Sequence, residues 1–454
     1  MESKLDRNLR PAFHITGGEG WINDPNGLAV FKERYHVFFQ YYPYGVKWGP
    51  MHWGHVSSAD LVKWERHPVA LCPDKPYDAD GCFSGSAIVW KDKLWLVYTG
   101  FVKGTDEKPQ RQVQCLAASA DGINFEKHGV IIDSDGLPDG YEPSDFRDPK
   151  VWRHNGAFWC VVAAKKTGGR GRVLLYRSDD LFKWDFVADV FGADCAGEMT
   201  ECPDYRENEG MMFVSVQFPD DRNLHKNIHA SLWYKGRLDY ATGKFVYEKS
   251  GIIDYGFDFY AAQTFCGENL MIGWLSMWDR TPVTESYGFS GMLTVPRKIS
   301  FDDSGLIQSP AVCLQQLAAA DVLNEYGDEI TEGALKITAE NLEEFSLKLR
   351  VKGSSYVSFS LSQGEWVFDR SKCSLKICGA ETDADSVAGI RRMPYTKKKV
   401  NEIIVLIDKF SVEIFADGKA MSSLTVTDAD AEGVELAVKA SRCSYVKYAV
   451  NSNI

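Results

Sequence analysis

The stretch Ser58-Ala59-Asp60-Leu61-Val62-Lys63-Trp64 recurs along the chain, and this recurrence decides the fold. Close copies lie at 119–125 (SADGINF) and 178–184 (SDDLFKW), and weaker copies end at Phe245 and Phe301. The aromatic residues at positions 64, 125, 184, 245 and 301 are 61, 59, 61 and 56 residues apart. A nearly fixed period of this kind indicates repeated supersecondary units.

Each period also contains one predicted β-hairpin. Short runs of aromatic and β-branched residues flank turns centred near positions 33, 92, 155, 208 and 268, which is the pattern of strand, turn and strand. An all-strand unit of about 60 residues has room for the four strands of a propeller blade. A tandem of small sandwiches is less favoured, because a unit this small hardly folds alone. We therefore expect an all-β protein that begins with a five-bladed β-propeller at residues 1–305.

The pattern changes after Phe301. Ser309–Ala320 carries an apolar stripe and a proline, which predicts a short helical connector within a linker at 306–321. Residues 322–454 return to alternating strands, such as Phe345–Val351 and Glu402–Ile407. We expect a second all-β domain there, a β-sandwich packed on the propeller.

Composition excludes several classes of protein. The 454-residue chain is 44% hydrophobic and has a net charge of −12, which argues against nucleic acid or an anionic membrane as the main partner. The first residues lack the apolar core of a signal peptide. The eleven cysteines are scattered singly, which is typical of reduced thiols in the cytoplasm and gives no zinc motif. We expect a cytoplasmic protein without a metal, and the sequence does not indicate its oligomeric state.

Five residues lie at nearly the same position within their repeat units. Asp24, Asp148 and Glu201 lie nine, seven and seven residues before their turn centres, and Ser84 and Tyr260 each lie eight before theirs. If the first strand of each hairpin is innermost, radial symmetry brings these residues to one mouth of the central axis. Such a carboxylate cluster binds a divalent cation or cleaves a glycosidic bond.

The motifs of the chain resemble those of glycoside hydrolase family 32, which contains invertases, fructanases and sucrose-6-phosphate hydrolases. The matching motifs, in the order of the family, are WINDPNG (21–27), Gln40, WGPMHWGH (48–55), FSGS (83–86), FRDPK (146–150), ECPD (201–204) and VEIF (412–415). The family fold is a five-bladed propeller followed by a sandwich, in agreement with the repeat. The resemblance implies a retaining β-fructofuranosidase that hydrolyses sucrose, sucrose 6-phosphate or short fructo-oligosaccharides through a covalent fructosyl-enzyme, without a cofactor.

The resemblance also implies residue roles. Asp24 would be the nucleophile, Glu201 the general acid and then the base, and Asp148 would hold fructosyl hydroxyls and stabilise the transition state. The remaining pocket residues implied are Asn23, Gln40, Trp48, Phe83, Ser84, Arg147, Tyr260 and Trp274. Retention requires the two reacting carboxyl groups to be roughly 5–5.5 Å apart. We expect Asp24 to stay ionised, and we expect partial burial and negative neighbours to raise the pKa of Glu201.

Other possibilities stay open at this stage. A non-catalytic protein that binds or senses carbohydrate could use the same scaffold, a fructosyltransferase would share the covalent intermediate, and an inverting, cation-containing glycosidase of the arabinanase kind would also be a propeller. The segment Trp274–Asp279 (WLSMWD) matches the family only loosely. Lys47 and Arg280 are candidates for binding a substrate phosphate by charge alone.

Overall fold

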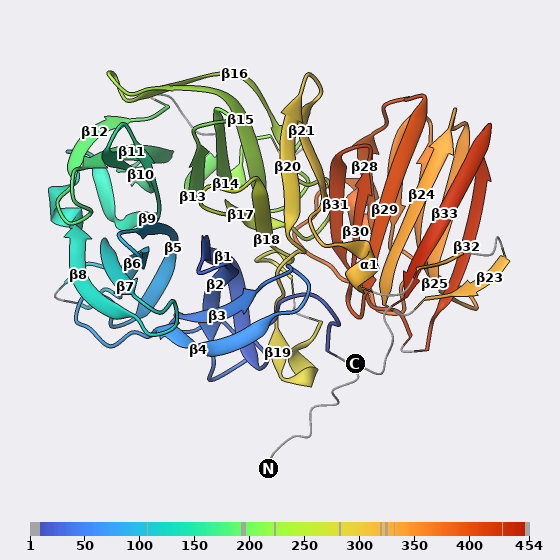
Figure 1. Cartoon of the computed structure of the whole chain (residues 1–454), viewed down its shortest axis with the longest axis horizontal. Coiled ribbons are helices and arrows are strands. Elements are labelled where there is room, and N and C mark those ends of the chain that lie inside the picture. The colour runs from blue at the N-terminus through green and yellow to red at the C-terminus, as the bar shows by residue number, and fades with distance from the viewer. Residues whose placement is uncertain are drawn as a thin grey trace, which may run out of the picture.

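The computed structural model describes residues 10–106, 108–191, 197–221, 224–280, 283–317, 320–322, 326–330, 332–428 and 430–449. Nearly all regular structure in these ranges is β-strand. Five sheets, blue to yellow in Figure 1, form an N-terminal part (10–310), and two larger sheets, orange to red, form a C-terminal part (311–449) beside it. In the described ranges, no helix has the length and apolar character needed to cross a membrane.

Each of the five N-terminal sheets contains an antiparallel meander of four strands, and the first sheet has a fifth, short strand. The strands are β1 (Gly20–Phe31), β2 (Arg34–Tyr42), β3 (His52–Ser58) and β4 (Glu65–Leu71); β5 (Gly81–Trp90), β6 (Lys93–Val102), β7 (Arg111–Ser119) and β8 (Glu126–Ile132); β9 (Tyr141–His154), β10 (Ala157–Lys166), β11 (Gly171–Ser178) and β12 (Asp185–Asp189); β13 (Gly197–Arg206), β14 (Met211–Pro219), β15 (His229–Asp239) and β16 (Lys244–Ile252); and β17 (Tyr260–Thr264), β18 (Leu270–Trp274), β20 (Arg297–Asp302) and β21 (Gly305–Pro310).

The first two strands of each sheet form the hairpins that the sequence predicts. In the first hairpin the turn residues Lys32 and Glu33 have φ values of +49° and +61°, and in the second Lys91 and Asp92 have +48° and +57°. Positive φ at both central residues matches the right-handed twist of the flanking strands. The hairpin prediction is therefore confirmed.

The recurring Ser-x-Asp stretch is a turn between the third and fourth strands. Ser58 Oγ accepts a hydrogen bond from the backbone N of Leu61 at 2.9 Å, and Asp60 Oδ1 accepts from the backbone N of Lys63 at 2.8 Å. The same contacts recur at Ser119 with Asp121 and at Ser178 with Asp180. The weak copy at Phe301 differs, because that residue lies within β20.

The first strands of the five sheets contact one another in a closed sequence. β1 contacts β5, β5 contacts β9, β9 contacts β13, β13 contacts β17, and β17 contacts β1 again. A short strand that the sequence did not predict, β19 (Phe289–Ser290), pairs in parallel with the start of β1. It belongs to the connection between β18 and β20, which the repeat pattern does not cover.

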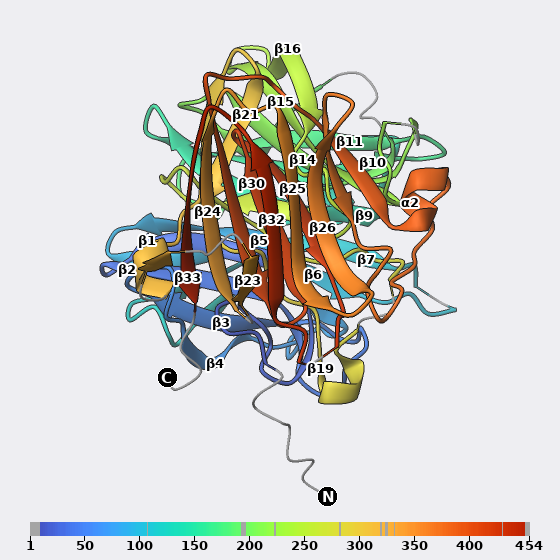
Figure 2. The same cartoon turned by 90° about the vertical axis from the view of Figure 1, so that its right-hand side faces the viewer.

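Two six-stranded sheets make up the C-terminal part. Their strands, in sheet order, are β22 (Ala320–Val322), β33 (Arg442–Ala449), β24 (Gly333–Glu340), β29 (Val400–Asp408), β30 (Ser411–Ala416) and β31 (Lys419–Leu424), and β23 (Tyr326–Glu329), β32 (Gly433–Lys439), β25 (Glu344–Lys352), β26 (Ser355–Ser362), β27 (Glu365–Asp369) and β28 (Ile390–Pro394). Leu335 and Val405 of one sheet share a buried core with Leu347 and Trp366 of the other. Figure 2 shows these strands in front of the N-terminal part.

The connector between the parts differs from the prediction. Residues Gly305–Pro310 form β21, the outer strand of the fifth sheet, and the helix α1 covers only Leu314–Leu317. Ser309 pairs with Lys298 and Pro310 with Arg297. A proline is tolerated there because β21 is an edge strand. The predicted helix over Ser309–Ala320 is therefore wrong for most of its length, while residues 318–319 lie outside the described residues. The second short helix, α2 (Ala384–Ala388), lies in the C-terminal part.

Buried ion pairs join the two parts. The guanidinium of Arg297 lies 2.9 Å from Asp254 and 2.8 Å from Glu413, and all three side chains are fully buried. His14 contacts the same Glu413 at 2.9 Å and Asp408 at 2.7 Å. Buried charges require partners of this quality, so these contacts define one orientation of the two parts.

Candidate active site

A β-bulge interrupts each of the five first strands, and β1 and β9 each have a second register shift. The paired residues on either side of the bulges are Ile22 and Pro25 in β1, Phe83 and Gly85 in β5, Arg147 and Lys150 in β9, Glu201 and Asp204 in β13, and Tyr260 and Gln263 in β17. A bulge adds one residue, bends the strand and changes the direction of a side chain. The five residues at nearly the same position of the repeat, Asp24, Ser84, Asp148, Glu201 and Tyr260, lie in or directly beside these bulges.

Side chains from these strands surround one open cleft with a volume of about 350 Å³. Nine of the eleven predicted site residues line it, namely Asn23, Asp24, Gln40, Trp48, Phe83, Ser84, Arg147, Asp148 and Glu201. Asp24 and Glu201, from strands β1 and β13, therefore face the same cavity.

The other two predicted residues lie behind the cleft wall. Tyr260 is 1% exposed, and its hydroxyl donates a hydrogen bond of 2.6 Å to Glu201 Oε2. Trp274 is also 1% exposed, and its ring packs 5.9 Å from that of Trp21. Tyr260 contacts Glu201 and Trp274 contacts Trp278, both residues of the wall, and a role of the two in the sugar pocket stays a prediction.

Asp24 is held by donors from two strands. Ser84 Oγ donates to Asp24 Oδ2 at 2.7 Å, and Asn23 Nδ2 donates to Oδ1 at 3.1 Å. Trp21 Nε1 in turn donates to Asn23 Oδ1 at 2.8 Å and orients that amide. Burial, reinforced by the negative charge of Glu201, raises the pKa of Asp24 to about 6, although the hydrogen bond from Ser84 acts in the opposite direction.

Asp148 lies in the deepest part of the cluster. It has φ of +64°, a conformation that is uncommon for a residue with a side chain. Its backbone N donates to Thr99 Oγ1 at 2.9 Å, and its Oδ2 accepts from the backbone N of Cys202 at 2.9 Å. Burial is the main reason that the pKa of Asp148 is raised to about 7, and Glu201 and Asp24 add to the effect.

Glu201 is stabilised in its ionised form. Arg147 donates to Glu201 Oε1 through Nε at 3.2 Å and Nη2 at 3.0 Å, and Tyr260 donates to Oε2. Burial acts to raise the pKa of Glu201, but the charge of Arg147 and these hydrogen bonds outweigh it and lower the pKa below its ordinary value. The prediction that the pKa of Glu201 is raised is therefore wrong for the free site.

The sequence missed six residues that line the cleft. They are Phe101, Gln110, Gln112, Ser144, Asp145 and Trp278. Gln112 Oε1 accepts from the backbone N of Phe146 at 2.9 Å and from Arg147 Nη1 at 3.4 Å, so it positions the arginine. Ser144 and Asp145 directly precede the FRDPK motif, and this neighbourhood could have identified them as cleft residues from the sequence.

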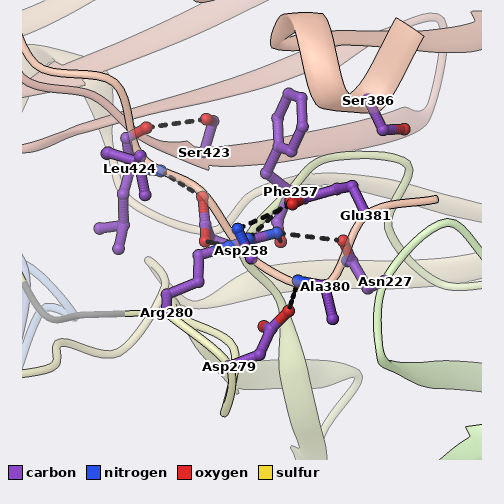
Figure 3. Close-up of polar contacts among 12 residues, drawn as sticks. Asn227, Phe257, Asp258, Asp279, Arg280, Ala380, Glu381, Ser386, Ser423 and Leu424 are labelled. Carbon is purple, nitrogen blue, oxygen red and sulfur yellow. Dashed lines mark hydrogen bonds and ion pairs between the residues drawn. The ribbon is translucent and has the colours of Figure 1, made fainter. Parts of the chain in front are cut away.

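The two candidate phosphate ligands lie elsewhere. Figure 3 shows Arg280 among residues of the interface between the parts, where its Nε donates to Asp258 Oδ1 at 2.7 Å. Lys47 is exposed and does not line the cleft. The assignment of Arg280 to a phosphate site is therefore wrong. Within the described ranges, no group of three or more His, Cys, Asp or Glu residues has the arrangement of a metal site.

Three carboxylates in a polar cleft, with amide, hydroxyl and aromatic side chains around them, define a site of the glycosidase class. Comparison with known proteins gives the family. Residues 14–310 match the glycosyl hydrolases family 32 N-terminal domain, and residues 311–452 match the family 32 C-terminal domain. The chain belongs to glycoside hydrolase family 32.

Individual relatives extend over nearly the whole chain. A sucrose-6-phosphate hydrolase of Escherichia coli is 35% identical, with 93% of this chain and 90% of that protein covered. A raffinose invertase of Escherichia coli is 34% identical, with 96% and 93% covered. The structure of a GH32 β-fructofuranosidase of Bombyx mori is 31% identical, with a TM-score of 0.83 and 99% and 96% of the two chains covered.

Proposed function

We propose that this protein hydrolyses the β-fructosyl bond of sucrose-type fructosides with retention of configuration. The observation that carries the proposal is that Asp24 and Glu201 face one cleft, with Asp148 between their strands. Its relatives of known name include sucrose-6-phosphate hydrolases and a raffinose invertase, and a variant of the Bombyx mori enzyme has been solved in complex with sucrose.

In the proposed reaction Asp24 attacks the anomeric carbon while Glu201 protonates the leaving oxygen. Glu201 then removes a proton from water, which releases fructose from the covalent fructosyl-enzyme. Asp148 accepts hydrogen bonds from fructosyl hydroxyls and stabilises the positive charge of the transition state. Asn23, Gln40, Trp48, Phe83, Ser84 and Arg147 surround the sugar, while Tyr260 and Trp274 support them from behind.

The free site holds its protons in the wrong places for this reaction, so binding must redistribute them. A sugar hydroxyl that donates to Asp24 stabilises the carboxylate and lowers its pKa. The leaving oxygen needs a proton from Glu201, and contact with it favours the protonated acid. We propose that substrate binding weakens the hold of Arg147 on Glu201 and thereby moves one proton from Asp148 to Glu201.

The fold proposed for this function is a five-bladed β-propeller followed by a β-sandwich. The closed series of contacts among the five first strands supports the propeller, and the shared core of the two six-stranded sheets supports the sandwich. Strand β21 extends the first domain from the predicted residue 305 to Pro310. The linker then starts at 311, and the second domain starts with β22 at Ala320, two residues before the predicted 322.

The alternatives differ in what they predict. A carbohydrate sensor needs no acid and base, whereas all three carboxylates face the cleft here. Fructosyl transfer uses the same intermediate and differs only in the acceptor.

Cytoplasmic location stays a prediction, which is supported by the free thiols of all ten cysteines in the described ranges.

Release of sugar from sucrose, sucrose 6-phosphate, a short inulin-type oligosaccharide and levan tests the proposal. Asp24→Asn and Glu201→Gln should each lose about 10³-fold or more in kcat while the thermal midpoint stays near that of wild type. Glu198→Gln is the matched control, because Glu198 is an exposed residue of the same strand β13 and should leave turnover unchanged. Near-normal activity of either cleft variant would refute the assigned roles.

A further inference from the structure

The C-terminal part contacts a segment that forms one wall of the cleft. The segment Leu275–Arg280 follows β18, and within it Trp278 lines the cleft. The Trp278 ring packs 5.1 Å from that of Trp274 and 6.1 Å from that of Trp21. Trp278 is therefore the last member of an aromatic row that ends at the cleft.

Residues of the C-terminal part hold the two positions directly after Trp278. The backbone N of Ala380 donates to Asp279 Oδ2, and Arg280 Nη1 lies 2.7 Å from Glu381 Oε1. The side chain of Arg280 is 1% exposed and that of Glu381 is 5% exposed. Figure 3 shows these groups converging from the two parts of the chain.

Glycine at 379 is part of the same arrangement. The backbone N of Gly379 donates to Glu381 Oε2 at 2.7 Å and orients that carboxylate. A Cβ atom at this position would overlap Arg280 Nη1 and Asp279 Oδ2. A side chain at position 379 would therefore displace the ends of Arg280 and Asp279 from their present contacts.

Asp258 joins this contact to the other side of the cleft. Its Oδ1 accepts from Arg280 Nε at 2.7 Å, and its Oδ2 accepts from Arg370 Nη1 at 2.9 Å and from the backbone N of Leu424 at 2.8 Å. Asp258 stands two residues before Tyr260, which donates to Glu201. Along the chain, the buried network therefore lies two residues from Trp278 through Arg280 and two residues from Tyr260 through Asp258.

We propose that Glu381, with Gly379 and Ala380, positions Trp278 as a substrate-binding wall, so that the C-terminal part contributes to substrate affinity. The inference rests on the proposed function of the cleft. Glu381 is a positioning residue, because it acts through Arg280 and has no place in the cleft. The expected signature is therefore a change in KM with little change in kcat.

The test compares Glu381→Gln, Gly379→Ala and Trp278→Ala in the full chain, with sucrose as substrate. Each should raise KM about three- to tenfold, the range expected for an aromatic contact, with kcat within about threefold of wild type. The double variant Trp278→Ala/Glu381→Gln should raise KM no further than Trp278→Ala alone, because the two residues act as one unit. Asp385→Asn is the control. It breaks the partly exposed pair with Arg392 in the same part of the chain and should leave KM unchanged.

Hydrogen exchange provides a readout that does not depend on activity. Amides of the segment Leu275–Arg280 should exchange faster in Glu381→Gln than in wild type and Asp385→Asn. Additive effects in the double variant, or unchanged KM and unchanged exchange in Glu381→Gln, would overturn the proposal. A wild-type protein that cleaves no fructoside would refute the proposed function instead, and the exchange result would still decide whether Glu381 holds the segment.

Discussion

Arg147 donates two hydrogen bonds to one oxygen of Glu201, at 3.2 Å and 3.0 Å, so that the free site keeps this carboxylate ionised. Asp148, the residue after Arg147 in β9, and Asp24 in β1 have pKa values raised to about 7 and about 6. Arg147 thus favours the ionised form of Glu201, so that protons bound by the site are on Asp148 and Asp24 instead. The first two predictions concern this distribution.

The acid limb of the pH profile should report the ionisation of Asp24. Attack requires the carboxylate, so kcat/KM should fall as the pH drops below about 6. Ser84→Ala removes a donor that lowers the pKa of Asp24 and should move this limb to higher pH by about half a unit to one unit. Ser144→Ala, which also alters a cleft serine but does not contact Asp24, should leave the limb in place. A limb that stays fixed in Ser84→Ala would contradict this assignment.

Asp148→Asn should abolish turnover and yet stabilise the fold at alkaline pH. Folding raises the pKa of Asp148 from an ordinary 3.8 to about 7, so the folded protein binds this proton more tightly than the unfolded chain. Below about pH 4 the carboxyl group of Asp148 does not change the free energy of unfolding. As the pH rises this free energy declines, and above about pH 7 the whole contribution of the pKa difference has been lost. Asparagine has no carboxylate to ionise in the buried site. The free energy of unfolding of the variant should therefore exceed that of wild type by about 1–3 kcal/mol at pH 8 and by little at pH 4. Thermal midpoints at both pH values check this, and a variant less stable than wild type at pH 8 would contradict it.

Sucrose should be a better substrate than sucrose 6-phosphate, although several relatives are named for the phosphorylated sugar. Arg147 is the only cation among the described residues that line the cleft, and it is paired with Asp145 at 3.1 Å and with Glu201 at 3.0 Å. A dianionic phosphate would meet an excess of negative charge. Asp145→Asn removes one carboxylate and should reduce the preference for sucrose in kcat/KM by about three- to tenfold. A higher kcat/KM of the wild type for sucrose 6-phosphate would contradict this reading.

Much of the fold could be predicted because it repeats. Turn residues and the Ser-x-Asp stretch are local signals, and they placed five hairpins correctly. The common position of Asp24, Asp148 and Glu201 within their repeat units was visible in the sequence as well. The second register shift of β1, between Asn26 and Ala29, adds one residue between Asp24 and its turn and contributes to the longer spacing there.

The remaining features depend on contacts between distant segments. Trp278 reaches the cleft through a connection outside the repeat, and Arg280 is anchored by Glu381, about 100 residues later in the chain. The direction of the pKa shift of Glu201 was mispredicted because it depends on which of the carboxylates Arg147 contacts. Spacing along the chain carries no information about such a choice between neighbouring acids.

The central claim is that Asp24 forms a covalent bond to the fructosyl group. In Glu201→Gln, a fructosyl fluoride supplies a leaving group that needs no acid, while the missing base slows release of the intermediate. Mass spectrometry of the quenched reaction should find one added fructosyl group on the peptide that contains Asp24, and none in the Asp24→Asn/Glu201→Gln double variant. Consumption of the fluoride with inversion and without an adduct, or an adduct on a different peptide, would contradict the account.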